Sequence, residues 1–302
     1  MTEHTPRNFV GFGQHRPDPR WPDGAALALS LVLNYEEGAE RTIESGDGET
    51  ETYLHELAGI PPKEEGRDLN VESAYEYGSR AGVWRLLSLF EEYDVPVTIF
   101  AVGQALELNP ALASALAVAE HEIASHHYRW IDYSNVPEET EREHIRRASS
   151  VIETMTGTRP VGFYGGRVSQ RSRALALEHG GLLYDSDAYD DDLPYWLEFP
   201  SGHHLIIPYT FDTNDVKYST PNGFTTPADF ASYLCDSFDE LWREGMAGRP
   251  AMMSVGLHCR VSGRPARTTA LRRFLDYALD HDGVWITRRD AIARHYHDTR
   301  VT

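Results

Sequence analysis

The chain has 302 residues, 41% of them hydrophobic, which is enough to bury a sizeable core within a single domain. Its 28 Lys and Arg residues against 47 Asp and Glu residues leave a formal net charge of −19, which disfavours binding to nucleic acid or to an anionic membrane. A small, neutral or polar substrate is more compatible with this charge.

The N-terminal stretch predicts no export signal. Residues 1–20 contain no apolar run that could form the core of a signal peptide, and no later run approaches the roughly 18 apolar residues of a membrane span. Only Cys235 and Cys259 occur, which favours reduced thiols over a disulfide framework. We therefore expect a cytoplasmic protein with no membrane partner.

Apolar runs of strand length alternate along the chain with stretches of helical periodicity. Strands are predicted at residues 25–33, 96–102, 122–125, 161–164, 182–184, 205–209, 251–257 and 284–286. Helices are predicted at residues 82–93, 110–120, 137–156, 169–179, 227–245, 267–280 and 288–295. Repeated β-then-α units predict a mainly parallel sheet, and this many units favour one α/β barrel, complete or distorted, over residues 1–302.

Residues 39–80 separate the first predicted strand from its helix. The segment is acidic and is interrupted by several Gly residues and by the pair Pro61-Pro62. A connection of roughly 40 residues is much longer than a usual loop. We expect an ordered excursion over the barrel mouth or a subunit contact rather than a linker.

Polar side chains follow most of the predicted strands. In a barrel of parallel strands these positions meet at the carboxyl-terminal face, where reactive groups gather. The polar segments after successive strands are residues 34–38 (NYEEG), 126–130 (HHYRW), 165–167 (GGR), 185–187 (DSD) and 258–260 (HCR).

Each of these groups also has a structural interpretation. As an isolated dipeptide, Glu36-Glu37 is typical of a solvated loop, and His126-His127 is typical of a hydrogen-bonded turn. Their position at strand ends favours a site instead, where one carboxylate can serve as a general base. His258 ends a buried strand and needs a polar partner, and Asp185 or Asp187 could orient His258 or Arg167. Residues 189–194 read as a solvated turn.

The common metal and cofactor motifs are missing from the sequence. His121-Glu122 begins like a zincin motif, but Ser125 stands where the second histidine is needed. Glu37, His126 and His127 remain conceivable ligands, although adjacent histidines seldom point at one ion. The sequence has no P-loop, no G-x-G-x-x-G after a strand and no G-x-S-x-G, so no cofactor is predicted.

Three short motifs resemble those of the polysaccharide deacetylases. Residues 33–38 stand where that family carries a strand ending in Asp-Asp-Gly, residues 125–130 where it carries His-Ser-x-x-His, and residues 254–258 where its last strand ends in Leu-x-His. Longer stretches resemble the allantoinase branch of that superfamily: residues 72–82, 165–167, 184–196, 209–215 and 256–267. The resemblance implies an irregular TIM-like (β/α) barrel, a homotetramer, and hydrolysis of the hydantoin ring of allantoin to allantoate.

The departures from the deacetylase pattern concern the metal. In that family the first Asp is the base, and the second binds a divalent ion together with two histidines. Here the carboxylates are Glu36 and Glu37, and Trp130 stands at the second histidine position. Because tryptophan cannot ligate such an ion, the resemblance implies hydrolysis without a metal.

The resemblance also implies roles for individual residues. Glu36 is expected to take a proton from the attacking water, Arg167 to orient Glu36, and His258 to protonate the leaving nitrogen. The expected substrate contacts are Glu37, His126, Trp130, Tyr75, Tyr77, Asp187 and Arg260.

Two other readings stay open at the level of sequence. One is a metal-dependent deacetylase of an N-acetylated sugar, which Trp130 disfavours. The other is a catalytically inactive carbohydrate-binding or scaffolding protein, which the retained polar groups at the strand ends disfavour. The enantiomer of allantoin, and the choice between allantoin and a related cyclic imide or ureide, are not determined by the sequence.

Overall fold

The computed structural model describes residues 7–57, 59–199 and 202–301, so the start of the N-terminal stretch considered above lies outside the described residues. The strands are β1 (Leu27–Tyr35), β2 (Thr98–Ala101), β3 (Glu122–Ser125), β4 (Gly162–Phe163), β5 (Tyr184–Asp185), β6 (Tyr195–Phe199), β7 (Gly202–Ile206), β8 (Ala251–His258) and β9 (Val284–Ile286). The α-helices are α1 (Leu69–Tyr77), α2 (Val83–Glu92), α3 (Gly103–Leu108), α4 (Pro110–Leu116), α5 (Glu138–Thr156), α6 (Ser172–His179), α7 (Pro227–Met246), α8 (Cys259–Ser262), α9 (Pro265–Leu279) and α10 (Arg289–Thr299). Short helical turns are η1 (Pro22–Gly24), η2 (Gly78–Gly82), η3 (Tyr133–Asn135) and η4 (Asp215–Ser219).

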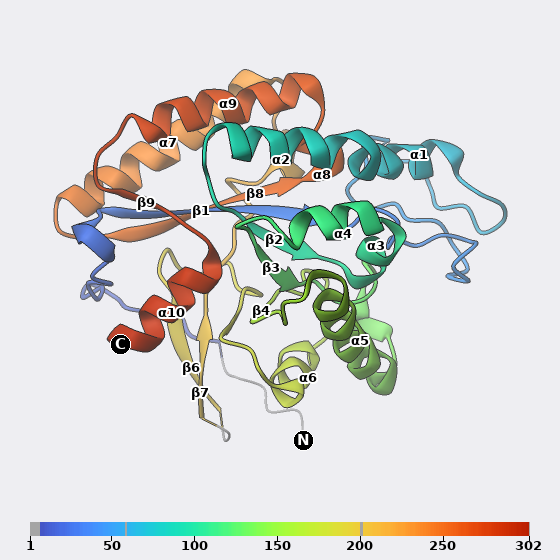
Figure 1. Ribbon diagram of the computed structural model, residues 1–302, viewed down its shortest axis with the longest axis horizontal. Helices are drawn as coiled ribbons and strands as arrows, with labels where there is room; N and C mark the ends of the chain where they lie inside the picture. Colours follow the sequence, from blue (N-terminus) through green and yellow to red (C-terminus); the bar gives the residue numbers. More distant parts are fainter. Residues whose placement is uncertain (1–6, 58, 200–201, 302) are drawn as a thin grey trace.

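One sheet organises the molecule. Its strands follow the order β6-β7-β5-β4-β3-β2-β1-β8, with β9 paired to β1. All neighbours are parallel except β6 and β7, which are antiparallel. The sheet curls into a half-barrel surrounded by helices (Figure 1). The prediction of an irregular TIM-like α/β barrel in one domain is confirmed.

Strand β1 pairs with β2, β8 and β9 and is buried on both faces along its whole length. Its odd-numbered residues, from Leu27 to Tyr35, pack in the large hydrophobic cluster beneath the helices. The even-numbered Val32 packs with Phe100, Tyr164 and Tyr209 in a smaller cluster on the opposite face. Because side chains alternate along a strand, the side chain of Asn34 lies on the barrel interior, like that of Val32. The strand ends at Tyr35, and Glu36 is the next residue.

Helices cover the outer face of the sheet. Figure 1 shows α2, α7 and α9 across β1 and β8, with α5 and α6 on the side of β3 and β4. Helix α7 begins with a capping box in which the side chains of Thr226 and Asp229 each bind the other's backbone amide. This layering leaves the carboxyl ends of the strands to the loops, as in other parallel α/β barrels.

Two elements differ from the predicted pattern. The charged run before Pro194 reads as a turn, but the chain then enters β6, whose side chains are only partly buried and so carry no strong apolar alternation. The predicted excursion at residues 39–80 also contains α1 and η2, which lead directly into α2. Asp68 starts this longer helical stretch, because its carboxylate accepts from the amides of Asn70 and Val71.

No helix in the described part of the chain combines the length and apolarity needed to cross a membrane.

Candidate active site

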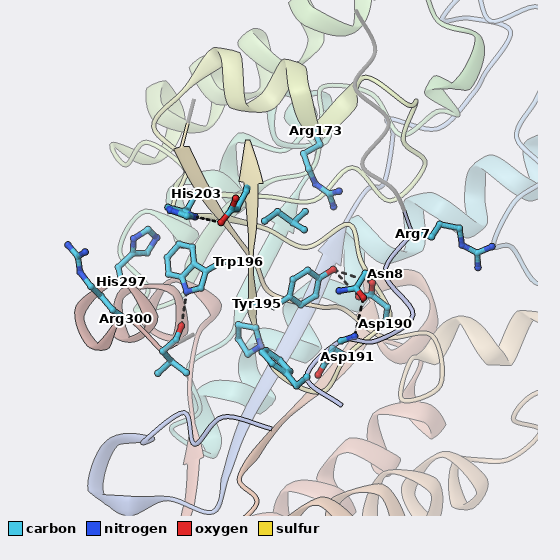
Figure 2. A pocket seen from close by; sticks show the side chains of 16 residues that line it. Arg7, Asn8, Arg173, Asp190, Asp191, Tyr195, Trp196, His203, His297 and Arg300 are labelled. Atoms are coloured by element: carbon cyan, nitrogen blue, oxygen red, sulfur yellow. Dashed lines mark hydrogen bonds and ion pairs between the residues drawn. The ribbon is translucent and has the colours of Figure 1, made fainter. Parts of the chain in front are cut away.

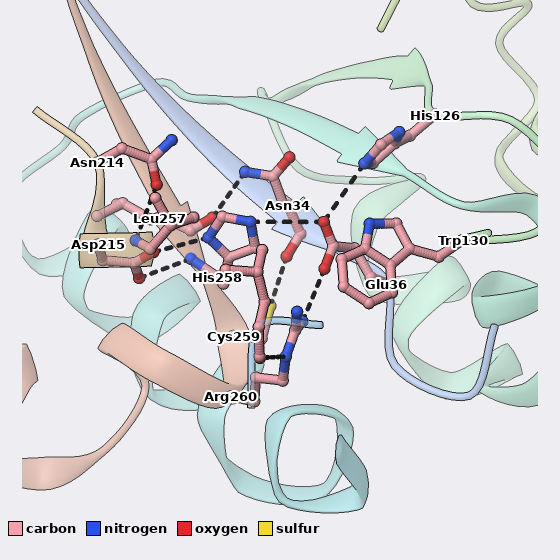
Figure 3. A network of polar contacts seen from close by, with 12 residues as sticks. Asn34, Glu36, His126, Trp130, Asn214, Asp215, Leu257, His258, Cys259 and Arg260 are labelled. Carbon is pink, nitrogen blue, oxygen red and sulfur yellow. Dashed lines mark hydrogen bonds and ion pairs between the residues drawn. The ribbon is translucent and has the colours of Figure 1, made fainter. Parts of the chain in front are cut away.

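The carboxyl ends of β1 and β8 bring Glu36 and His258 together. Asn34 of β1 is the register partner of His258, and Glu36 follows two residues later. One Glu36 oxygen, Oε1, lies 3.3 Å from His126 Nε2 and 3.5 Å from His258 Nε2. The other, Oε2, accepts a 2.7 Å hydrogen bond from Arg260 Nη1 (Figure 3). Four of the predicted site residues therefore meet at one carboxylate.

Glu36 and His258 are shifted toward their charged forms. Burial raises the pKa of Glu36, but the charges of Arg260 and His258 outweigh burial and hold this pKa well below its usual value. Burial lowers the pKa of His258, whereas the carboxylates of Glu36 and Asp215 raise it, with a net result of about 9. Near neutral pH, Glu36 is a carboxylate ready to accept a proton, and His258 is an imidazolium ready to donate one.

Asp215 orients His258. This role of Asp215 was not predicted from the sequence. Its Oδ1 lies 2.7 Å from His258 Nδ1, while its Oδ2 accepts from the backbone amides of His258 and Ser262. Because Nδ1 is committed to this carboxylate, Nε2 is the ring atom that faces Glu36. Asp215 belongs to the stretch 209–215 that carries the family resemblance, and this was the available signal.

The prediction that Asp185 or Asp187 orients His258 or Arg167 is wrong. Asp185 binds the guanidinium of Arg173 and the ring of His204. Asp187 accepts from the backbone amides of Gly165 and Gly166, and burial together with the charge of Asp185 raises its pKa to about 6. It thus shapes the loop that carries Arg167, and a contact between Asp187 and substrate stays a prediction.

Arg167 does not pair with Glu36. Its Nη1 lies 2.9 Å from Glu51 Oε2, and its guanidinium carbon lies about 5 Å from the ring centres of Trp130 and Tyr53. The arginine that binds Glu36 is Arg260. It follows β8 directly and reaches Glu36 across the end of β1, whereas the loop after β4 carries Arg167 to the long segment that precedes α1.

Glu37 helps to hold Arg260 in position. Its Oε1 accepts from the Arg260 backbone amide and lies 3.6 Å from Arg260 Nη1, while its Oε2 accepts from the Glu36 amide. A Cβ at Gly78 would come within 2.3 Å of Glu37 Oε1, so this approach requires glycine at Gly78. Glu37 therefore acts as a positioning residue, and a direct contact with substrate stays a prediction.

An aromatic wall closes the site. The Tyr53 ring stacks on Trp130 with centroids 5.8 Å apart, and the Arg260 guanidinium lies over the ring of buried Tyr75. Tyr75 also donates from its hydroxyl to the Tyr53 carbonyl at 2.8 Å. Predicted Tyr77 lies elsewhere, because its contacts are with Gly263 and with the side chains of Arg85 and Arg264.

The residues of the site do not fit a divalent ion. Trp130 offers no ligand atom, and the cation beside the two carboxylates is the Arg260 guanidinium. His127 has a positive φ of 59° and stacks on Tyr133 at 3.9 Å, so it is no partner for His126 at an ion. Within the described residues, no three His, Cys, Asp or Glu side chains converge as a metal site.

A separate cavity of about 820 Å³ lies beside β6 and the end of α10. Figure 2 shows Tyr195, Trp196, His203, His297 and Arg300 around it. None of the described residues that line this cavity belongs to the predicted site. The cluster of Glu36, His258 and Arg260 therefore lies outside this cavity, beneath the aromatic wall.

Comparison with known proteins identifies related sequences and structures. The polysaccharide deacetylase family model matches residues 63–181. A protein from Schizosaccharomyces pombe described as a putative polysaccharide deacetylase is 41% identical over 291 residues, covering 91% of each chain. The crystal structure of the Puue allantoinase is 52% identical, with a TM-score of 0.95 and 98% of each chain covered. A probable polysaccharide deacetylase from Pseudomonas aeruginosa PAO1 is also 52% identical, with a TM-score of 0.94 and coverage of 97% of this chain and 98% of the other.

Proposed function

The chain belongs to the polysaccharide deacetylase family of hydrolases, and we propose that this member opens the hydantoin ring of allantoin to give allantoate without a metal ion. The observation that carries the proposal is the Glu36 carboxylate held between the His258 imidazolium and the Arg260 guanidinium, with Trp130 at the position of a family metal ligand. The similarity to an allantoinase over 98% of the chain supports the choice of substrate.

The arrangement supplies a base, an acid and a positive charge. Glu36 takes a proton from water as the water oxygen attacks the ring carbonyl carbon. The resulting oxyanion is stabilised by Arg260, whose Nη2 is buried and has no hydrogen-bond partner among the described residues. The ring C–N bond then breaks as His258 donates its proton to the departing nitrogen, which leaves a carboxylate and a ureide.

The leaving group explains why an arginine suffices where deacetylases use a metal ion. The nitrogen of a simple acetamide departs as an amine, which needs strong polarisation of the carbonyl. In a hydantoin the departing nitrogen is flanked by a second carbonyl that delocalises its charge. Fixed hydrogen-bond donors, each of which stabilises the developing oxyanion by about 3 kcal/mol, are then sufficient to polarise the carbonyl.

The closed site favours a small substrate over a polysaccharide. Glu36 is 1% exposed and His258 is 4% exposed, and Tyr53 and Trp130 lie above them. A ring of a few atoms can be enclosed beneath this wall after a local opening. A sugar polymer would need an open groove that runs past the catalytic groups.

The decisive experiment measures allantoate formation from racemic allantoin by protein dialysed against a chelator, with and without added zinc or cobalt. Full activity in the chelated sample is the expected result. Deacetylation of an N-acetylated sugar that depends on added metal would favour the alternative function, for which the name of the yeast relative is the supporting observation. No activity on either substrate would favour the inactive binding protein.

Replacing Glu36 by Gln should lower kcat by a factor of about 100 or more, because the amide cannot take up the water proton. Glu44→Gln is the matched control, since it removes a carboxylate that is largely exposed. Steady-state kinetics and the melting temperature of both variants are the measurements. Near-normal turnover by a folded Glu36→Gln variant would remove Glu36 from the role of base.

The cytoplasmic location and the homotetramer stay predictions.

A further inference from the structure

Asn34 presents a buried oxygen that no described protein group satisfies. Its Nδ2 donates to the Leu257 carbonyl at 3.0 Å and to the Tyr209 hydroxyl at 2.9 Å. A carbonyl can only accept, so the Leu257 contact fixes which end of the amide carries nitrogen. The residue is 1% exposed, and Oδ1 has no hydrogen-bond donor within the described chain.

Asn34 lies beside Glu36 and His258. Asn34 is the register partner of His258 across β1 and β8, and it precedes Glu36 by two residues on the interior side of β1. Figure 3 shows the Asn34 amide beside the Glu36 carboxylate, with His258 and His126 on either side. A ligand that reaches Glu36 and His258 therefore comes within range of Asn34.

An unsatisfied acceptor at this place selects for a donor. A buried acceptor left without a partner is unfavourable, and this cost disappears when a bound molecule donates to it. Arg260 and the imidazolium of His258 are donors, so Asn34 Oδ1 adds an acceptor to a part of the site that already holds the Glu36 carboxylate. The complementary group on a cyclic ureide is a ring N–H.

We propose that Asn34 is a specificity-determining residue whose Oδ1 accepts the N–H of the ring nitrogen that departs; this inference rests on the proposed function. During bond breaking that nitrogen keeps its hydrogen toward Asn34 and receives a second one from His258. It leaves as the NH₂ of the ureide, so both of its hydrogens are accounted for. The substrate class is therefore a five-membered cyclic ureide or imide that is unsubstituted at the nitrogen between its two carbonyls.

The test compares kcat/KM for allantoin with that for allantoin methylated at this nitrogen. The wild-type enzyme should prefer the N–H ring by about 100-fold or more. In Asn34→Leu, which keeps the approximate volume but has no acceptor, kcat/KM for the N–H ring should fall about 10- to 100-fold. The methylated ring should lose no more than a few-fold, so that the preference collapses.

Tyr209→Phe is the matched control. It removes the hydroxyl that accepts from Asn34 Nδ2 and leaves Oδ1 in place. Its preference for the N–H ring should equal that of the wild type. If Asn34→Leu and Tyr209→Phe lower the rates for both rings equally and the preference stays, Asn34 has only a structural role and the inference is overturned.

A second measurement does not depend on an Asn34 variant. In a crystal structure of Glu36→Gln with the N–H ring bound, the ring nitrogen should lie within about 3.2 Å of Asn34 Oδ1. A bound ring with that nitrogen directed elsewhere would overturn the inference while leaving ring opening intact. A wild-type enzyme that opens neither ring would instead refute the proposed function.

Discussion

Glu36 and His258 are 3.5 Å apart, and each favours the charged form of the other. The carboxylate raises the pKa of the imidazole, and the imidazolium, with Arg260, lowers the pKa of the carboxylate. The hydrolysis takes one proton from water and donates one to the leaving nitrogen. It therefore requires a base and an acid whose pKa values are well separated. Because the two groups are this close, their titrations belong to the pair.

The pH dependence of kcat/KM follows from these shifts. His258 must be protonated to act as an acid, so activity should fall as pH rises through about 9. Glu36 must be ionised to act as a base, and its pKa lies well below the usual value, so the acid limb should appear only below about pH 4.5. Initial rates from pH 4 to pH 10.5 would show this plateau. A midpoint near 6.5 on the alkaline side would contradict an imidazolium stabilised by two carboxylates.

Asp215→Asn should shift the alkaline limb to lower pH. The substitution removes one of the two negative charges that raise the pKa of His258, and a nearby opposite charge is worth about 1–3 pKa units. Asp212→Asn, in the same loop but exposed, is the control and should leave the limb in place. A lower rate with an unchanged pH profile would limit Asp215 to holding the loop.

The site residues that could be predicted from the sequence are those whose position is determined by the strand they end or follow. Glu36, His126 and His258 directly follow or end a strand, so the parallel sheet brings them together. Arg167 lies four residues after β4 in a loop, and Arg260 lies two residues after β8 in α8, so the path of the chain after each strand decides which of them reaches Glu36. Asp215 sits at the start of η4, far from any predicted strand end, and its role depends on a turn that no periodicity reveals.

The segment between β1 and α1 forms the cover of the site. Glu51 accepts from the Thr52 and Tyr53 amides and pairs with Arg167, while the Leu54 carbonyl accepts from Arg260 Nε. An excursion over the barrel mouth or a subunit contact stays the prediction for residues 39–80, and this part of the segment contacts Arg167 and Arg260. Since Glu36 is buried beneath it, substrate entry requires this cover to open locally.

Glu51→Gln should weaken the cover. The substitution removes the charge that holds Arg167, an interaction of about 1–3 kcal/mol for a largely buried pair, so kcat/KM should fall roughly tenfold. Amide hydrogen exchange over residues 50–57 should become faster in the same variant. Glu49→Gln removes an exposed partner of Arg41 in the same segment and should change neither measurement appreciably. Equal effects from both variants would argue against a specific closing contact.

Helices and strands could be predicted from the sequence where burial gives them a regular pattern of apolar residues. Strand β8 is apolar along most of its length, and α5 and α7 have clear helical periodicity, so their positions agree with the predicted ranges to within two residues. Strand β6 is only partly buried and follows a run of aspartates, which hid it. Helix α1 lies in an acidic segment and buries few of its residues, Val71 and Tyr75 among them, which is too few to set a periodicity.

At the scale of the whole molecule, the half-barrel has to hold its two ends together without continuous strand pairing. Arg289, at the start of α10, is fully buried between them. Its guanidinium donates to the carbonyls of Ile207 and Pro208 just after β7, and to the Ser254 hydroxyl on β8 at 2.9 Å. One side chain thus connects the two halves of the fold beneath the active site.

Arg289→Leu should therefore destabilise the whole protein. The substitution leaves several buried oxygens without a donor, at about 1–3 kcal/mol each, so the free energy of unfolding should fall by about 3 kcal/mol or more. For a chain of this size the melting temperature should then drop on the order of 5–10 °C. Arg288→Leu is the control at the neighbouring position, where a partly exposed ion pair with Asp290 is worth about 1 kcal/mol or less. Calorimetry of the two variants would decide the point: similar melting temperatures would show that helix packing, and not the buried guanidinium, joins β7 to β8.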